Sequence, residues 1–463
     1  MKPDKTSAGP GRTESSGGVG GVAMRAATLS FGAILLYNLA GFAFNLYDTV
    51  LYAWLPYFYT PPADSGNTAY VTLFVFGVIL FGGRVLDAVT DPLLGFWSDR
   101  TRSRWGRRKP YIFISSPILF ITFVLVWRPP VPGVSTANAV WLGSVLFFYY
   151  WAYTGLLIPW LANLPELSPD NGVRMKIISV GIVTGIVGAL AGGGLSGPLM
   201  HGKGPLFMAL FLGVFAFAAG ELTLFGIREN PGILPNEGPG FAATLKAMFS
   251  DRQVFSFSAM IMAVQMTYQL TLMNVPYVTT LILKKSEGSA SLLIGEIIVL
   301  MAVSTPLWYF LLKTYPKRRI MRIIILLMAL GFAASFMIGR FGFLSPFAQA
   351  VLILPLAAVP MGGMFMASLG LIADLTDYGE TLHGTRTEAV YFGIYGIARK
   401  TGWAFCSLIL TATFSIFGYT AGNPLGVRVL WILCALFCLI GLILFIPYRL
   451  GDSPEETRRI MKA

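Results

Sequence analysis

Long apolar stretches dominate this sequence, and they limit the folds that the chain can adopt. An α-helix needs about 20 apolar residues to cross a hydrocarbon core of about 30 Å. Backbone groups must be paired inside lipid, and these stretches lack the short alternation of barrel strands, which leaves helices. Twelve spans are expected, at residues 31–59, 70–97, 109–128, 138–163, 175–198, 205–227, 252–283, 290–313, 320–340, 345–375, 388–417 and 427–448.

The composition supports a membrane protein, because 55% of the residues are hydrophobic and only 12% are charged. The formal net charge of +12 comes largely from short loops such as "RTRSRWGRRK" and "KTYPKRRIMR", whereas "TPPADSGNTA" has no basic residue. Basic residues that follow membrane sidedness indicate topology and not nucleic-acid binding. We expect a multi-pass protein of the plasma (inner) membrane with both termini cytoplasmic, whose basic clusters contact membrane lipids.

The polar segment 228–251 divides the spans six and six, and each half carries its basic loop between its second and third spans. This arrangement resembles the major facilitator fold, in which the substrate site lies between two halves. The predicted fold class is an all-α membrane protein with twelve transmembrane helices in two pseudo-symmetric six-helix bundles. The predicted parts are a disordered cytoplasmic tail (1–30), an N-terminal bundle (31–227), a cytoplasmic linker (228–251), a C-terminal bundle (252–448) and a cytoplasmic tail (449–463).

Charged side chains interrupt the second span. Asp87 and Asp91 are four residues apart, so they share one helix face, and Arg84 lies on the same side. Charges at this depth are costly and face protein or water. One interpretation is a buried salt bridge that fixes helix register. However, Arg84 neutralises only one aspartate, so the second favours a bound cation, either Na⁺ held by oxygen ligands or H⁺.

Lys400 is the best-embedded lysine of the second half, beside Arg399 in "YFGIYGIARKTGWAFCSLILT". We expect it to act as counter-charge to Asp87 and Asp91 across the cavity, together with Arg84. The alternative is that its ammonium group reaches toward the cytoplasmic interface.

Three stretches carry a resemblance to a known family: "GRVLDAVTDPLLGFWSDRTRSRWGRRKPY", "AYTGLLIPWLANLPELSPDNGVR" and "IADLTDYGETLHGTRTEAVYFGIYGIARKTG". Over residues 31–448 the chain resembles the glycoside/pentoside/hexuronide cation symporters. The resemblance implies a symporter that couples solute import to H⁺ or Na⁺ by alternating access. We expect a monomer with no cofactor other than the coupling ion. The resemblance also implies that Asp87, Asp91, Tyr153 and Thr154 form the cation site and that Lys400 is the matching lysine.

The sequence departs from the family at three polar positions that contact the sugar, which hold Asn45, Leu157 and Ile182. Leu157 replaces a carboxylate, and the loss of this oxygen ligand gives a slight preference for H⁺ over Na⁺. A sugar or glycoside is the substrate that the family implies, while these replacements favour an amphipathic, lipid-like molecule. Gln265 and Gln269 have a second interpretation as interhelical hydrogen-bonding residues. The candidate substrate-binding residues are Asn45, Asp48, Trp160, Gln265, Gln269, Asn274 and Trp403.

Charged residues of both signs flank the cytoplasmic loops of both halves, and we interpret them as a gate of weak ion pairs. The alternative is that they are topology signals and solvated loops. The predicted gate comprises Asp99, Arg100, Arg107, Arg108, Asp170, Arg174, Asp374, Asp377, Glu380 and Arg386.

Two other function classes remain open from the sequence. An enzyme is disfavoured because His201 and His383 are the only histidines and no catalytic motif is present. A passive facilitator is disfavoured because it needs no titratable pair such as Asp87 and Asp91.

Overall fold

The structure is a computed structural model, and it describes residues 29–168, 170–227, 229, 246, 249–383 and 388–451. Over these residues the chain is helical and contains no strand. The elements are α1 (Phe31–Tyr59), α2 (Leu73–Arg100), α3 (Lys109–Leu125), α4 (Thr136–Leu167), α5 (Asn171–Lys203), α6 (Pro205–Gly226), α8 (Arg252–Tyr277), η1 (Val278–Ile282), α9 (Glu287–Thr314), α10 (Lys317–Ser335), α11 (Pro346–Ile353), α12 (Pro355–His383), α13 (Glu388–Phe417) and α14 (Leu425–Leu444).

The expected spans and the described helices correspond, which confirms the predicted fold class. The seventh span is α8 continued by the π-helical turn η1, and the tenth is divided at Leu354 into α11 and α12. Pro355 begins α12, and proline cannot donate the hydrogen bond that would continue α11. Nine helices in the described ranges are long and apolar enough to cross a membrane. The helix Lys109–Leu125 is apolar but shorter.

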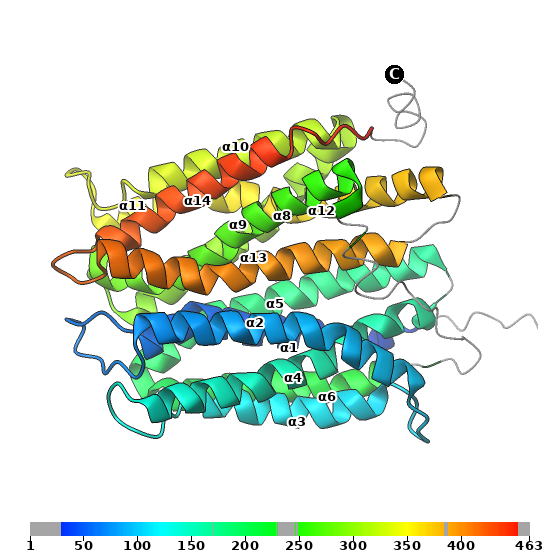
Figure 1. Ribbon diagram of the computed structural model, residues 1–463, viewed down its shortest axis with the longest axis horizontal. Helices are drawn as coiled ribbons and strands as arrows, with labels where there is room; N and C mark the ends of the chain where they lie inside the picture. The colour runs from blue at the N-terminus through cyan, green and yellow to red at the C-terminus, as the bar shows by residue number, and fades with distance from the viewer. Residues whose placement is uncertain are drawn as a thin grey trace, which may run out of the picture.

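The helices run side by side along the long axis of the molecule (Figure 1). The N-bundle, α1–α6, forms one half and the C-bundle, α8–α14, the other. Within the N-bundle α1 packs on α5 and α6, and α4 packs on α2 and α3; in the C-bundle α8 packs on α13 and α14, and α12 on α9 and α10. The bundles meet where α2 packs on α13, α5 on α9 and α1 on α8.

Glycines allow α1 and α5 to approach closely. A Cβ atom added at Gly188 would lie 2.2 Å from the carbonyl oxygen of Phe42, and one at Gly192 would lie 2.8 Å from that of Leu46. Small residues at such positions are typical of membrane helix pairs, where close backbone packing replaces the hydrophobic effect. This seam holds α1 in the interior of the N-bundle.

The two ends of the molecule differ. We call the end that carries loop 101–108 the basic end, and it lies at the right in Figure 1. We call the end that carries loop 60–72 the opposite end, and it lies at the left in Figure 1. At the opposite end the bundles are joined by Tyr277, whose hydroxyl donates to the Thr60 carbonyl at 3.1 Å. The Asn67 amide also donates to Glu287 Oε1 at 3.3 Å. Contact between the bundles is therefore established at this end.

The predicted tails and linker (1–30, 228–251 and 449–463) lie almost entirely outside the described residues. Their predicted states stay predictions, as do the domain limits.

Candidate functional site

The charged face of α2 lies inside the protein. Asp87 is fully buried, Arg84 is buried, and the Asp91 side chain retains 24% of its exposure. The Arg84 guanidinium pairs with Asp87 at 3.0 Å between Nη1 and Oδ2. This ion pair was one interpretation of the sequence, and it leaves Asp91 to be balanced by another group.

Thr154 brings α4 to the two carboxylates. Its Oγ1 lies 2.9 Å from Asp87 Oδ1 and 3.2 Å from Asp91 Oδ1. The hydroxyl of Thr90 donates to Thr154 Oγ1 at 3.3 Å. Two carboxylates and a hydroxyl therefore converge on one point, which is the kind of oxygen set that a hard cation prefers.

Lys400 reaches the same carboxylates from α13. Its Nζ lies 2.5 Å from Asp91 Oδ2 and 3.1 Å from Asp87 Oδ2, and its side chain is 9% exposed. Because Lys400 belongs to the C-bundle and both aspartates to the N-bundle, this contact crosses between the bundles. Two positive groups, Arg84 and Lys400, thus balance two negative ones.

Aromatic rings surround Arg84. The centre of its guanidinium lies 4.5 Å from the ring centroid of Tyr52, 5.1 Å from that of Tyr150 and 5.5 Å from that of Trp403. Such contacts stabilise a cation where water is excluded. Arg399 also lies over Trp403, at 4.8 Å. The indole of Trp403 is therefore near two guanidinium groups from opposite bundles.

The candidate substrate residues of the N-bundle lie on α1 and α4. The Tyr153 hydroxyl, which the resemblance places in the cation site, donates to Asp48 Oδ2 at 2.8 Å. Asn45 is exposed, and its amide donates to the Gly41 carbonyl within α1. The Trp160 indole donates to the Tyr37 carbonyl at 2.8 Å. Tyr153 thus links α4 to α1.

The candidate amides of α8 are buried. Gln265 Nε2 contacts the Tyr395 hydroxyl at 3.3 Å, and the Trp403 indole donates to the Gln265 carbonyl. The Asn274 amide donates to the Val427 carbonyl of α14 at 3.0 Å, which is an interhelical hydrogen bond. The Gln269 amide nitrogen has no hydrogen-bond partner among the described residues.

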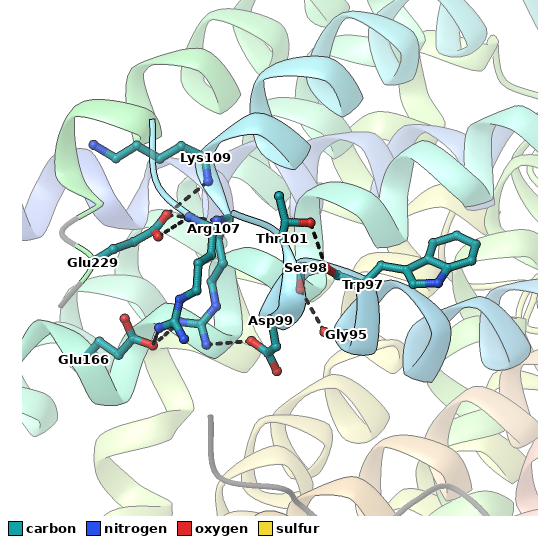
Figure 2. A network of polar contacts seen from close by, with 10 residues as sticks. Gly95, Trp97, Ser98, Asp99, Thr101, Arg107, Lys109, Glu166 and Glu229 are labelled. Atoms are coloured by element: carbon teal, nitrogen blue, oxygen red, sulfur yellow. Dashed lines mark hydrogen bonds and ion pairs between the residues drawn. The ribbon is translucent and has the colours of Figure 1, made fainter. Parts of the chain in front are cut away.

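A second polar cluster lies at the basic end (Figure 2). Arg108 pairs with Asp99 at 3.0 Å and with Glu166 at 2.7 Å, and Arg107 pairs with Glu166 at 2.8 Å. The carboxylate of Glu229 accepts the backbone N–H groups of residues 107–109 at the start of α3. A negative group is stabilised there because the first N–H groups of a helix have no partner within it.

The other predicted gate residues take several positions. Asp170 caps α5 by accepting the N–H groups of Gly172 and Val173. Arg174 Nε donates to the Ser168 carbonyl, and the Arg100 guanidinium lies over Phe96. Further gate residues lie in the C-bundle: Asp374 pairs with Lys317, Asp377 and Glu380 lie near the end of α12, and Arg386 is outside the described residues.

Three of these partners were missed by sequence reasoning: Glu166, Glu229 and Lys317. Glu166 carried a signal, because it is the only charged residue of α4. The ion pairs named for the predicted gate residues join residues of the same bundle, so the gate between bundles stays a prediction.

Residues 36–449 match the model of a family described as MFS/sugar transport protein, where MFS is the major facilitator superfamily. The chain belongs to this family. The match confirms the resemblance inferred from the sequence and makes the protein a multi-pass membrane protein of a transporter family.

Individual relatives are distant. Over 431 residues the chain is 24% identical to the putative glycoside/cation symporter YagG of Escherichia coli (strain K12), covering 88% of this chain and 90% of the relative. Over 135 residues it is 28% identical to the sodium-dependent lysophosphatidylcholine symporter 1 of Gallus gallus, covering 29% of this chain and only 25% of the relative. The crystal structure of the nucleoside transporter NupG superimposes with a TM-score of 0.63 at 12% identity, covering 90% and 98%.

Proposed function

We propose that the protein is a cation-coupled symporter that uses H⁺ or Na⁺ to import a small organic solute by alternating access. The observation that carries the proposal is the position of Lys400, whose ammonium group bridges Asp87 and Asp91 where a cation would bind. Thr154 adds a third oxygen to the same point.

The coupling follows from competition for the carboxylates. A bound cation and the Lys400 ammonium cannot both be fully paired, because Arg84 already occupies one oxygen of Asp87. Binding of the cation therefore releases Lys400 and removes a contact between the bundles. A ligand that binds one conformation better shifts the population toward it, so the released bundles can rock about the site.

We propose a sugar or glycoside as the solute, supported by the similarity to YagG along most of both chains. The polar groups of Asn45, Asp48 and Gln269 supply the hydrogen bonds that sugar hydroxyls need once water is removed. A second candidate is an amphipathic, lipid-like molecule. It is favoured by the local similarity to the lysophosphatidylcholine symporter and by apolar Leu157 and Ile182 at positions where the family binds sugar.

The transport assay uses purified protein in liposomes, with glycosides and lysophosphatidylcholine as solutes. We expect accumulation only under an imposed gradient of Na⁺ at equal pH, or of pH without Na⁺, and the effective gradient identifies the ion. Asp87→Asn and Asp91→Asn should each abolish accumulation, because each removes a negative charge from the site. Asp64→Asn, in the loop at the opposite end, is the matched control and should accumulate solute normally, because an asparagine oxygen can still accept the hydrogen bond that Asp64 receives from the Ala421 N–H. Equal accumulation by wild type and both site variants would disprove the coupling.

The remaining parts of the proposal concern the setting of the protein. Alternate loops rich in arginine support a plasma (inner) membrane protein with both termini in the cytoplasm. The basic end would then be cytoplasmic, and the clusters around Arg108 and Asp374 would form its gate. We further propose that the protein works as a monomer, because each chain contains both bundles and the complete set of coupling residues.

A further inference from the structure

A small cavity lies beside Arg84, between the two bundles. Its volume is about 10 Å³, which is room for at most one water molecule. The lining comes from α1, α2 and α4 on one side and from α8 and α13 on the other. Any separation of the bundles therefore enlarges it. The polar and aromatic residues of the lining are Tyr52, Arg84, Tyr150, Gln269, Trp403 and Ser407.

The cavity is surrounded by hydrogen-bond donors that lack acceptors. Arg84 Nε and Nη2 are buried without a partner among the described residues, and so are the hydroxyls of Tyr52 and Tyr150 and the amide nitrogen of Gln269. Arg84 as a whole is only 4% exposed. Buried donors are nearly always satisfied in native proteins, and one water cannot satisfy this set. The missing partner is therefore a group with several acceptor oxygens.

Arg399 extends the same donor set from the C-bundle. Its guanidinium lies over the Trp403 ring that Arg84 also contacts, and its Nε is buried without a partner in the described part of the chain. Planar guanidinium groups match carboxylate, sulfonate and phosphate oxygens better than they match sugar hydroxyls. Two guanidinium groups, those of Arg84 and Arg399, lie beside the indole of Trp403. This arrangement favours binding of a ligand whose acidic group is next to an apolar or sugar ring.

The charge balance of the cation site leads to the same requirement. Without a cation, the positive groups Arg84, Lys400 and Arg399 are balanced by the negative groups Asp87, Asp91 and Asp48. A cation bound to the aspartates leaves one positive charge in excess in a buried environment. An anion beside Arg84 restores neutrality, so cation and anion should bind cooperatively, and each should raise the affinity of the other equally.

We propose that the transported solute carries an acidic group, which Arg84 and Arg399 bind next to Trp403. This inference rests on the proposed function, since it concerns the solute of the same site. The acidic group is a carboxylate or sulfonate of an acidic glycoside, or the phosphate of a lysophospholipid. Both kinds of solute present anionic oxygens to the arginines, and they differ in whether a sugar or an acyl chain carries the acidic group.

The experiment measures binding to the full chain by isothermal titration calorimetry, with and without Na⁺ and at two pH values. Two matched pairs of probes are used: methyl β-glucuronide with methyl β-glucoside, and lysophosphatidylglycerol with a monoacylglycerol of equal chain length. We expect the acidic member of one pair to bind on the order of tenfold more tightly than its neutral partner, and more tightly with the coupling cation. The pair that shows this preference identifies the kind of solute.

The variants are Arg399→Gln, which removes a guanidinium without touching the aspartates, and Arg399→Lys, which keeps the charge. Arg399→Gln should bring the two affinities within about threefold of each other, while Arg399→Lys should keep part of the preference. Thermal unfolding checks that both variants are folded.

Three results would overturn the proposal: equal affinities for both members of each pair, no binding of either acidic probe, or an unchanged preference in Arg399→Gln. None of these readouts needs an ion gradient. Uphill transport without acid preference would therefore reject this proposal alone, and acid preference without uphill transport would reject only the coupling.

Discussion

Thr154 is the residue on which the two carboxylates of α2 depend for their common geometry. Its hydroxyl is within hydrogen-bonding distance of both Asp87 and Asp91, while Lys400 contacts their other oxygens. A hydrogen bond to a charged group contributes about 1.5–3 kcal/mol. The residue is fully buried, so water cannot replace the hydroxyl.

We predict that Thr154→Val weakens binding of the coupling cation by about tenfold or more, which corresponds to about 1.4 kcal/mol. Valine keeps the shape of threonine but removes the hydroxyl that contacts both carboxylates. The concentration of cation that gives half-maximal solute uptake measures the effect. Thr122→Val is the control, because the Thr122 hydroxyl bonds only to carbonyls of its own helix. An unchanged half-maximal concentration in Thr154→Val would exclude Thr154 from the site.

Spacing and charge predicted part of this site. The four-residue interval between Asp87 and Asp91 placed both carboxylates on one face, and charge balance indicated Lys400. The rings around Arg84 could not be predicted, because Tyr52, Tyr150 and Trp403 come from three helices and meet only through tertiary packing. Their sequence context is that of ordinary membrane-core aromatic residues.

At the scale of helices, close backbone contact at glycines joins α1 to α5, in addition to side-chain hydrogen bonds such as that from the Thr184 hydroxyl to the Asn38 carbonyl. Gly188 faces the Phe42 carbonyl so closely that no Cβ atom fits there. By contrast, a Cβ atom at Gly194 in the same helix meets nothing within 4 Å. The two glycines therefore have different roles despite their identical chemistry.

We expect Gly188→Ala to lower the free energy of unfolding by about 1–3 kcal/mol, because α1 and α5 must move apart. Gly194→Ala is the matched control and should be neutral or stabilising by up to about 1 kcal/mol. Thermal unfolding of both purified variants in the same detergent provides the comparison. Equal melting temperatures for the two variants would show that the seam tolerates a methyl group.

Helix boundaries were predictable where composition changes sharply and less so elsewhere. The apolar runs located every helix, but α4, α5 and α12 continue past their expected ends at 163, 198 and 375 to Leu167, Lys203 and His383. Polar residues can extend a helix beyond the apolar core, so hydropathy underestimates its length. The division at Leu354 depends on Pro355, whose effect within an apolar run cannot be read from hydropathy alone.

At the scale of the whole molecule, contact between the bundles at the opposite end has to break if transport follows alternating access. Asn67 lies in the loop after α1 and Glu287 at the start of α9, and their side chains are in contact across the interface. Asn67 is exposed and Glu287 is partly exposed, so both positions are accessible to reagents.

We predict that a short thiol-reactive cross-linker stops transport by the double variant Asn67→Cys and Glu287→Cys. Holding these positions together prevents the opposite end from opening. The single variants treated with the same reagent are controls and should retain transport, because the native cysteines 406, 434 and 438 are buried. Full solute accumulation by the cross-linked protein would show that this end does not open during transport.

Lys400 also determines how the protein would respond to the supply of its driving ion. A tethered ammonium group competes at a fixed, high local concentration, so the ion must exceed a threshold before it can occupy the aspartates. The same competitor returns after delivery and helps expel the ion into a compartment where it is scarce. Lys400 would thus prevent transport in the absence of an ion gradient and accelerate release of the ion when a gradient is present.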